Sequence, residues 1–303
     1  MRDRPRHPDP VPHQRGAAST DAGHVTTVAH RGASAFVPEN TLASFRRAIA
    51  VGADLVELDV QRTRDGELVI LHDTSAARTT DARLALPGRA PWHVGDLTFD
   101  ELRGLDAGAW KSPRFAGERV PTLAEVITLL EHSTTGMLLE LKSPNLYPGI
   151  EAEVAVQMKA FGGYVERGVA TSRLVVESFD LGSLRTYRDL EPTVPIGVLG
   201  SPRAASLPAL ATWADQVNPD HRAIDAGYVA EIQRVGMRCL TWTVNRDAGM
   251  RRAIDLGVDG LITNRPELLR AVLTADGDTV RGGRTLPVAA HPRGRGAACA
   301  PWR

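Results

Sequence analysis

This chain of 303 residues has only two cysteines, and it lacks long apolar runs and an excess of charge of one sign. The two cysteines, Cys239 and Cys299, fall in an expected strand and an expected tail, so neither a disulfide framework nor a zinc site is indicated. The formal net charge of +0 excludes a global field that would recruit nucleic acid or an anionic membrane. No apolar run approaches membrane-spanning length, so we expect no stable membrane insertion.

The two ends of the chain lack the patterns of folded structure. Residues 1–24 are rich in Pro, Arg, His and Asp and have no apolar core of a secretory signal, which favours a cytoplasmic protein with a disordered N-terminal arm. Gly, Arg and Pro dominate residues 275–303, which is typical of a disordered tail. We therefore expect one folded domain over residues 25–274. Nothing in the sequence indicates an oligomeric state.

Between these ends, short apolar runs alternate with helical patterns. We expect strands at residues 25–29, 54–60, 67–71, 137–141, 174–178, 195–199, 216–218, 238–244 and 257–263. We expect helices at residues 39–51, 122–131, 150–167, 181–189, 204–213, 226–235, 247–256 and 266–273. Such repeated units predict an α/β fold, a closed (β/α)₈ TIM barrel. Residues 74–119 break the alternation and predict a small insertion after the second β unit, for example a cap over the site.

Two acidic residues stand inside an apolar run. Glu57 and Asp59 are two residues apart, so on a strand their side chains point to the same face. They could be a surface pair, but their apolar neighbours require burial on both faces of the strand. Buried carboxylates need compensation, which a bound cation commonly supplies. Glu140, near the end of another strand, adds a third carboxylate, and such oxygen ligands suit Mg²⁺ or Ca²⁺.

Histidines and cations follow several of these strands. His30 and His72 end two expected strands, and together they could supply the base and the acid that phosphodiester cleavage needs. His30 alone would more often be a structural histidine, but Arg31 beside it and His72 at another strand end favour a functional role. Arg31 can clamp a phosphate with its planar fork, and Lys142, one of few lysines, can add a positive charge. The combination indicates an anionic substrate, which a glycosidase would not require.

Two aromatic residues are candidates for a substrate wall. Trp242 lies at a strand end, where it could equally be barrel core, and Phe179 follows another strand as a weaker candidate. The sequence contains no G-x-S-x-G motif and no cysteine paired with a placed histidine, so nucleophilic hydrolase chemistry is disfavoured.

These residues lie in a series of short motifs that, taken together and in order, resemble the glycerophosphodiester phosphodiesterase family over about residues 25–274. The matching runs are His30-Arg31-Gly32, Pro38-Glu39-Asn40-Thr41, Glu57-Leu58-Asp59-Val60, Asp65-Gly66, His72-Asp73, Gly108-Ala109-Trp110, Val120-Pro121-Thr122-Leu123, Glu140-Leu141-Lys142, Trp242-Thr243-Val244-Asn245 and Asp259-Gly260-Leu261-Ile262-Thr263-Asn264. Any one of these runs alone would be weak.

The resemblance implies a TIM barrel that hydrolyses glycerophosphodiesters, such as glycerophosphocholine and glycerophosphoethanolamine, to sn-glycerol 3-phosphate and an alcohol. It implies that a divalent cation is bound by Glu57, Asp59 and Glu140. It further implies His30 and His72 as general acid and base, with Arg31 and Lys142 on the phosphate.

Two alternatives remain open at this point. One is a lysophospholipase D-like phosphodiesterase that acts on lysophospholipids, with residues 74–119 setting the choice of substrate. The other is a non-catalytic phosphodiester-binding barrel, which is disfavoured because no predicted metal ligand or histidine is lost. Whether a water molecule or the substrate's own 2-hydroxyl attacks phosphorus is not decided by the sequence.

Overall fold

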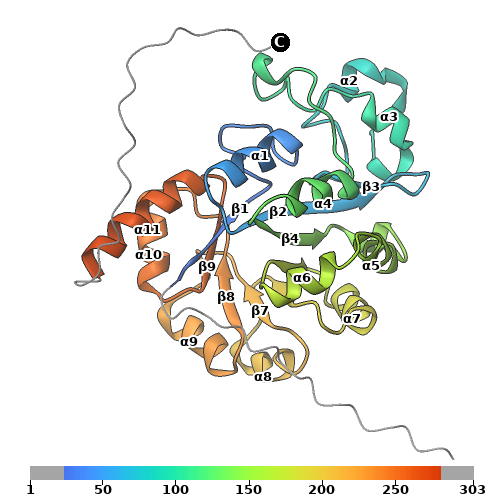
Figure 1. Cartoon of the computed structure of the whole chain (residues 1–303). Coiled ribbons are helices and arrows are strands. Elements are labelled where there is room, and N and C mark those ends of the chain that lie inside the picture. The colour runs from blue at the N-terminus through green and yellow to red at the C-terminus, as the bar shows by residue number, and fades with distance from the viewer. Residues whose placement is uncertain (1–23, 281–303) are drawn as a thin grey trace, which may run out of the picture.

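The computed structural model describes residues 24–280 of the chain. Eight parallel strands close into a barrel in the order β1-β9-β8-β7-β6-β5-β4-β2, because β1 also pairs with β2 (Figure 1). The barrel strands are β1 (Thr26–Ala29), β2 (Leu55–Arg62), β4 (Gly136–Leu141), β5 (Leu174–Ser178), β6 (Ile196–Leu199), β7 (Gln216–Asn218), β8 (Arg238–Thr241) and β9 (Gly260–Thr263). The predicted TIM barrel is therefore confirmed.

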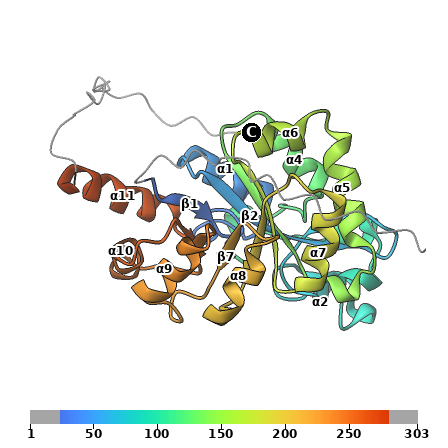
Figure 2. The same cartoon turned by 90° about the horizontal axis from the view of Figure 1, so that it is seen from below.

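Helices surround the ring of strands, as Figures 1 and 2 show. They are α1 (Leu42–Ala50), α4 (Leu123–Glu131), α5 (Ile150–Ala160), α6 (Tyr164–Ala170), α7 (Leu181–Leu190), α8 (Leu207–Leu210), α9 (Ala226–Arg234), α10 (Asp247–Asp255) and α11 (Pro266–Val280). Short 3₁₀ turns at Pro144–Leu146 and Ala204–Ser206 lie in connecting segments. Thr41 and Thr122 begin α1 and α4 with capping boxes, in which the threonine oxygen accepts from a first-turn backbone N–H.

Several boundaries differ from those predicted. The single helix expected over residues 150–167 is wrong: two helices form, and Gly163 lies between them with φ +72°, a backbone conformation that favours glycine. The strand expected to end at residue 244 ends at Thr241, and the strand expected from residue 257 begins at Gly260. The last helix continues to Val280, past the expected start of the tail. The predicted N-terminal arm, the remainder of the tail and Cys299 lie outside the described residues.

The inside of the barrel has an apolar layer and a charged layer. The apolar layer consists of six buried side chains from six strands, Val28, Leu55, Leu138, Val175, Leu240 and Ile262. Burying a side chain of this size stabilises the fold by about 1.5–3 kcal/mol. Because side chains alternate along a strand, the residues two places further along β2, β4 and β5 also face inward. Those residues are Glu57, Glu140 and Glu177, so the carboxylates stand directly above the apolar layer.

An additional strand, β3 (Leu68–Ile70), pairs antiparallel with the end of β2 outside the barrel. The turn between them contains Gly66 at φ +96°, and the chain then runs back until the Leu71 N–H donates to the Asp59 carbonyl, 2.9 Å away. His72 follows at once. His72 follows a strand as expected, but that strand, β3, is not one of the parallel strands of the barrel. His72 reaches the site because the β2–β3 hairpin folds back.

The segment from residue 74 to residue 119 forms a small subdomain beside the barrel, with helices α2 (Ala82–Ala85) and α3 (Phe99–Arg103) (Figure 1). It also contains 3₁₀ turns at Pro87–Arg89, Val94–Asp96 and Pro113–Phe115. Its apolar side chains pack with those of β3 and the adjoining residues in a core separate from the main one, formed by Val69, Leu71, Ala76, Ala82, Val94, Leu97, Leu102, Leu105, Ala107 and Val120. Two cations tie it to the β1–α1 loop: Lys111 Nζ donates to the Ser34 carbonyl at 2.7 Å and Arg114 Nη2 to the Phe36 carbonyl at 3.1 Å.

The described part of the chain contains no helix with the length and apolar character needed to cross a membrane.

Candidate active site

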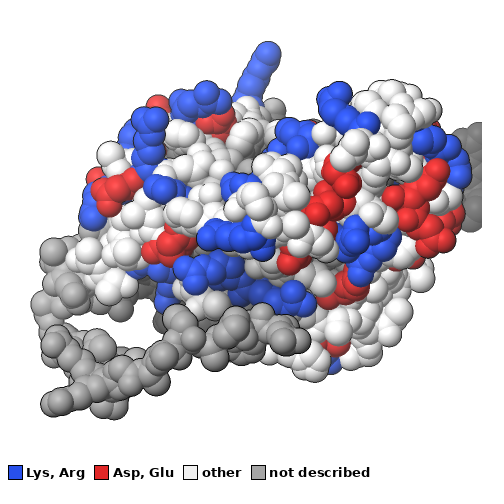
Figure 3. Space-filling view, turned by 90° about the horizontal axis from the view of Figure 1, so that it is seen from above, with Lys and Arg blue, Asp and Glu red and all other residues white. Residues whose placement is uncertain are grey.

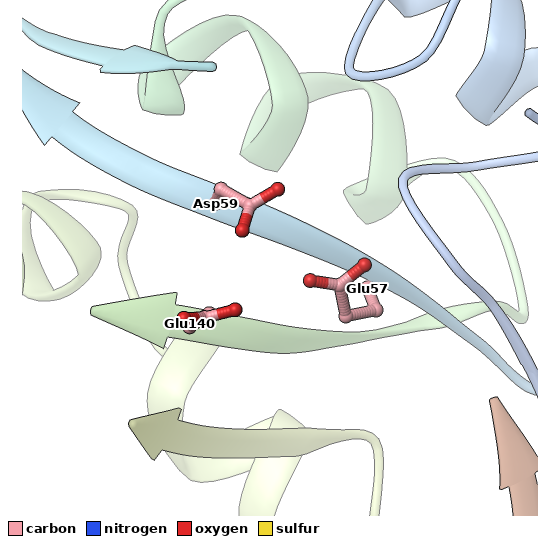
Figure 4. Close-up of side chains that lie close together, drawn as sticks. All are labelled: Glu57, Asp59 and Glu140. Carbon is pink, nitrogen blue, oxygen red and sulfur yellow. The ribbon is translucent and has the colours of Figure 1, made fainter. Parts of the chain in front are cut away.

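Three carboxylates meet at the carboxyl ends of β2 and β4. Asp59 pairs in register with Glu140, and Glu57 lies two residues before Asp59 on the same face of β2. One oxygen of each residue lies within 4.8 Å of one oxygen of each of the others, and Figure 4 shows the three groups turned toward a common space. All three side chains are buried. The predicted ligand set is thus assembled by strand register alone.

Each carboxylate has a different set of partners. Glu57 Oε2 accepts from the backbone N–H of Arg31 at 2.7 Å. Asp59 Oδ2 accepts from Asn40 Nδ2 at 2.7 Å, and Glu140 Oε1 accepts from Lys142 Nζ at 2.9 Å. Asp59 Oδ1 has no hydrogen bond within the described residues, although Lys142 Nζ lies 3.4 Å away. A buried carboxylate oxygen is thereby left free for a ligand.

The electrostatics of the cluster favour a cation. Burial, together with the neighbouring Asp59, raises the pKa of Glu57 and of Glu140 well above the ordinary value. Burial also acts to raise the pKa of Asp59, but Lys142 and Arg31 outweigh it and hold that pKa below its usual range. A divalent cation would allow all three groups to stay ionised. Three carboxylates without a nitrogen or sulfur donor fit a hard cation such as Mg²⁺ or Ca²⁺.

His30 directly follows β1. Its Nδ1 lies 2.6 Å from Asn264 Oδ1, a bond that requires the proton on Nδ1, and its Nε2 lies 4.0 Å from Glu57 Oε2. Burial, and then the charge of Arg31, lower the pKa of His30 to about 4. The imidazole is consequently neutral near neutral pH, with Nε2 free to accept a proton.

His72 stands at the end of the β2–β3 hairpin. Its Nδ1 is 2.7 Å from Asp73 Oδ1, so the carboxylate fixes the ring with Nε2 directed away from it. Burial lowers the pKa of His72, although Asp59 acts in the opposite direction. His30 and His72 both line one cavity of about 160 Å³.

Arg31 adopts a left-handed backbone conformation, with φ +54°. Such a conformation is uncommon outside glycine and is frequently retained at functional sites. The next residue, Gly32, has φ +80°, and a Cβ there would lie 2.4 Å from Ser44 Oγ, so only glycine fits. The guanidinium donates from Nη1 to Glu39 Oε1 at 2.8 Å and lies with Nε 3.6 Å from Asp59 Oδ2. The loop thus holds the Arg31 fork against the carboxylates.

Two aromatic side chains line another part of the cavity. Phe179 and Trp242 directly follow β5 and β8, and their rings meet edge to face with centroids 5.8 Å apart. Trp242 Nε1 donates to the Asn218 carbonyl at 2.7 Å, which fixes the indole, while the Phe179 side chain is 54% exposed. Eight of the nine predicted site residues line the cavity, and the ninth, Asp59, is completely buried beneath it. The structure therefore brings all nine together.

Comparison with known proteins identifies the family. The model of the glycerophosphoryl diester phosphodiesterase family matches residues 30–268. The chain belongs to this family. It is 39% identical to a glycerophosphodiester phosphodiesterase of Caldanaerobacter subterraneus, covering 80% of this chain and 95% of that protein. It is 35% identical to a glycerophosphodiester phosphodiesterase of Bacillus subtilis, covering 82% of this chain and 86% of the other.

Solved structures of family members agree with the fold. The chain is similar to an Oleispira antarctica phosphodiesterase in complex with the product sn-glycerol-3-phosphate, with a TM-score of 0.72 and 27% identity over 82% of this chain and 96% of that one. It is also similar to a glycerophosphodiester phosphodiesterase from Agrobacterium tumefaciens, with a TM-score of 0.67 and 28% identity over 82% of this chain and 100% of the other. The predicted family and enzyme class are confirmed.

Several residues of this family member's site were not assigned a role from sequence. Asn40 is hydrogen-bonded to Asp59 and Asn264 to His30. Both asparagines lie in the motifs that resemble the family, and nothing else in the sequence indicated a role for them. Glu177 lines the cavity next to Glu140 in register, and burial raises its pKa to about 8. Glu177 could have been found from the sequence, because it is an acidic residue in an apolar strand, as Glu57 is. Arg78, whose contacts are described below, lies in no sequence pattern that indicates a role.

The surface carries charges of both signs. On the face that Figure 3 shows, basic and acidic side chains lie next to one another.

Proposed function

We propose that this protein hydrolyses glycerophosphodiesters, such as glycerophosphocholine and glycerophosphoethanolamine, to sn-glycerol 3-phosphate and an alcohol. The observation that carries the proposal is one cavity lined by two histidines, two cations and two of three clustered carboxylates, the third of which, Asp59, is buried beside them. The product complex of the Oleispira antarctica relative supports the same substrate class. The cytoplasmic location expected from residues 1–24 stays a prediction.

Glu57, Asp59 and Glu140 would hold a divalent cation, Mg²⁺ or Ca²⁺. When bound, the cation would supply positive charge that stabilises the oxygens of the phosphodiester in the transition state. Arg31 would bind a phosphate oxygen through its planar fork. Lys142, whose Nζ forms ion pairs with both Asp59 and Glu140, would add a second positive charge beside the phosphate.

The two histidines would move the protons. Both have Nδ1 bonded to an oxygen of a neighbouring side chain, Asn264 or Asp73, which leaves each Nε2 available. One Nε2 would take the proton of the attacking oxygen as its bond to phosphorus forms. The other would have to carry a second proton on its Nε2, as an imidazolium, and would donate that proton to the alcohol oxygen as the bond between phosphorus and that oxygen breaks. Phe179 and Trp242 would form the wall for the rest of the substrate.

The test is a product assay with controlled metal. Protein treated with chelator is incubated with glycerophosphocholine, alone and with Mg²⁺ or Ca²⁺, and sn-glycerol 3-phosphate is measured. We expect product only when cation is present. A parallel assay with lysophosphatidylcholine, read as choline release, tests the lysophospholipase D alternative. If no metal condition yields product from glycerophosphocholine, the proposal is wrong for this substrate.

Variants separate the roles of the site residues. Glu57→Ala should abolish cation-dependent turnover while the fold is kept. His30→Gln and His72→Gln should each lower kcat by about 10²–10⁴-fold without weakening cation binding, since proton transfer commonly contributes that much. His132→Gln is the control, because His132 lies exposed at the end of α4. Retained activity in Glu57→Ala would refute the metal assignment.

A further inference from the structure

Arg78 lies outside the cavity lining, in the segment that leads from His72 into the subdomain of residues 74–119. Its guanidinium binds two carboxylates from different parts of the chain. Nε and Nη2 donate to Asp73 Oδ2 and Oδ1 at 2.6 and 2.9 Å. Nη1 and Nη2 donate to Glu39 Oε2 and Oε1 at 3.0 and 2.8 Å. All three guanidinium nitrogens are used, and each carboxylate is held in a bidentate manner.

Each of these two carboxylates also holds a residue of the site. Asp73 Oδ1 accepts from His72 Nδ1 at 2.7 Å, and Glu39 Oε1 accepts from Arg31 Nη1 at 2.8 Å. A continuous chain of hydrogen bonds therefore runs from the His72 imidazole through Arg78 to the Arg31 guanidinium. It joins the hairpin end to the β1–α1 loop, two segments that are otherwise separated by β2 and β3 in the sequence.

We propose that Arg78 is a positioning residue that fixes His72 and Arg31 relative to each other. The inference rests on the proposed function, in which His72 moves a proton and Arg31 binds the phosphate. These two tasks must be performed on the same phosphorus, so the distance between the imidazole and the guanidinium fork matters as much as the place of either group. Arg78 is the group within the described structure that is hydrogen-bonded to the supports of both.

Stability alone does not account for this arrangement. Exposed ion pairs contribute little to the free energy of unfolding, and the Arg78 side chain is 44% exposed. Glu39, by contrast, is largely buried, and burial acts to raise its pKa. Hydrogen bonds from Arg78 and the charge of Arg31 outweigh burial, so the pKa of Glu39 is lowered and the carboxylate stays ionised. Without Arg78, the Glu39 carboxylate would keep its bond from Arg31 and the Asp73 carboxylate its bond from His72, but no common partner would fix the two carboxylates relative to each other.

The primary test is Arg78→Ala in the full chain, assayed with glycerophosphocholine and cation. We expect kcat to fall by about 10–100-fold, the size of effect that loss of an orienting partner commonly has. Arg78→Lys should show nearly the same loss, because an ammonium cannot bridge two carboxylates in fork geometry. Added guanidinium ion at millimolar concentration should restore part of the activity of Arg78→Ala.

Arg103→Ala is the matched control. Arg103 lies in the same subdomain and binds Glu125 in a bidentate manner at 2.8 and 2.6 Å, with 35% exposure, but it does not touch the site. Its kcat should stay within about threefold of the wild type, and guanidinium should not raise it. Equal loss in both variants would show that the subdomain merely loosens, and would overturn the proposal. Wild-type activity in Arg78→Ala, or full activity in Arg78→Lys, would overturn it as well.

A readout that does not depend on turnover separates this proposal from the proposed function. The Nδ1–H proton of His72 is assigned by proton NMR, from its loss in His72→Gln. We expect its signal to broaden through exchange with water in Arg78→Ala and to persist in Arg103→Ala. If the wild type failed to turn over any substrate, the proposed function would fail while this measurement still decided the role of Arg78. An unchanged His72 signal in Arg78→Ala would refute the positioning role.

Discussion

Asn40 supports the proposed cation site without being one of its carboxylates, and its removal gives the sharpest test of how that site is built. Its Nδ2 donates to Asp59 Oδ2 at 2.7 Å, and the guanidinium of Arg31 lies further from that oxygen, with Nε 3.6 Å away. Asn40 has φ +54° and is buried, so the substitution that preserves the backbone is Asn40→Gly. The variant leaves Asp59 ionised but free to turn.

The magnitude follows from what Asp59 loses. A residue that orients a metal ligand is commonly worth about 10–100-fold in metal affinity, or about 1.4–2.7 kcal/mol. Loss of a hydrogen bond to a buried charged group should also lower the free energy of unfolding of the metal-free protein by about 1.5–3 kcal/mol. Added glycine flexibility contributes up to about 1 kcal/mol more.

Calorimetric titration of chelator-treated protein with Mg²⁺ and with Ca²⁺ measures the affinity directly, and thermal unfolding confirms that the variant is folded. The control is Asn218→Ala. Asn218 is equally buried and its Nδ2 donates to a buried carboxylate, that of Glu177, which is not one of the three predicted ligands. We expect the control to change cation affinity by less than about threefold.

Two results would refute the reasoning. A folded Asn40→Gly protein that binds cation with wild-type affinity would show that Asp59 needs no orientation. An equal loss in Asn218→Ala would show that any disturbance of the charged layer weakens the cation site, so that the ligand assignment would lose its support.

Two further predictions concern stability. Hydrogen bonds from Arg78 lower the pKa of Asp73 to about 2, so the ionised Asp73 stabilises the fold above its ordinary pKa, and this contribution is lost as pH falls toward 2. The difference in free energy of unfolding between wild type and Asp73→Asn, measured with urea, should therefore shrink by about 0.5–1 kcal/mol between pH 5 and pH 3. A difference that stays constant with pH would contradict this. Gly108→Ala should lower the unfolding temperature strongly, because a Cβ there would lie 1.9 Å from the Phe115 carbonyl oxygen, whereas Gly88→Ala, with open space around it, should be nearly neutral in the same thermal scan.

Much of the fold and most of the site could be predicted from sequence, because both follow from short-range pattern. Alternating apolar runs place the strands, and in a parallel barrel residues at the strand ends must meet at one face. His30, Lys142, Phe179 and Trp242 each directly follow a barrel strand, so the pattern was sufficient to find them. The break at Gly163 was also visible in principle, because two adjacent glycines interrupt a helical pattern.

What the sequence could not provide are the partners that come from elsewhere in the chain. Arg78 binds Glu39, which is 39 residues away, and Asn264 binds His30, which is 234 residues away. No periodicity connects such positions. The hairpin was equally hard to interpret, because β3 has the same apolar pattern as a barrel strand and only its antiparallel pairing with β2 shows that it lies outside the barrel.

The β2–β3 hairpin has a consequence for how this enzyme can be changed. Because the backbone pairing with β2 brings His72 to the site, the subdomain that follows acts on the imidazole through Arg78, and it packs in an apolar core separate from that of the barrel. We therefore expect that the length and surface of this subdomain can be altered without rebuilding the barrel. A replacement subdomain has to keep Arg78. It also has to supply hydrogen-bond donors for the carbonyls of Ser34 and Phe36, through which the present subdomain contacts the loop that bears Arg31.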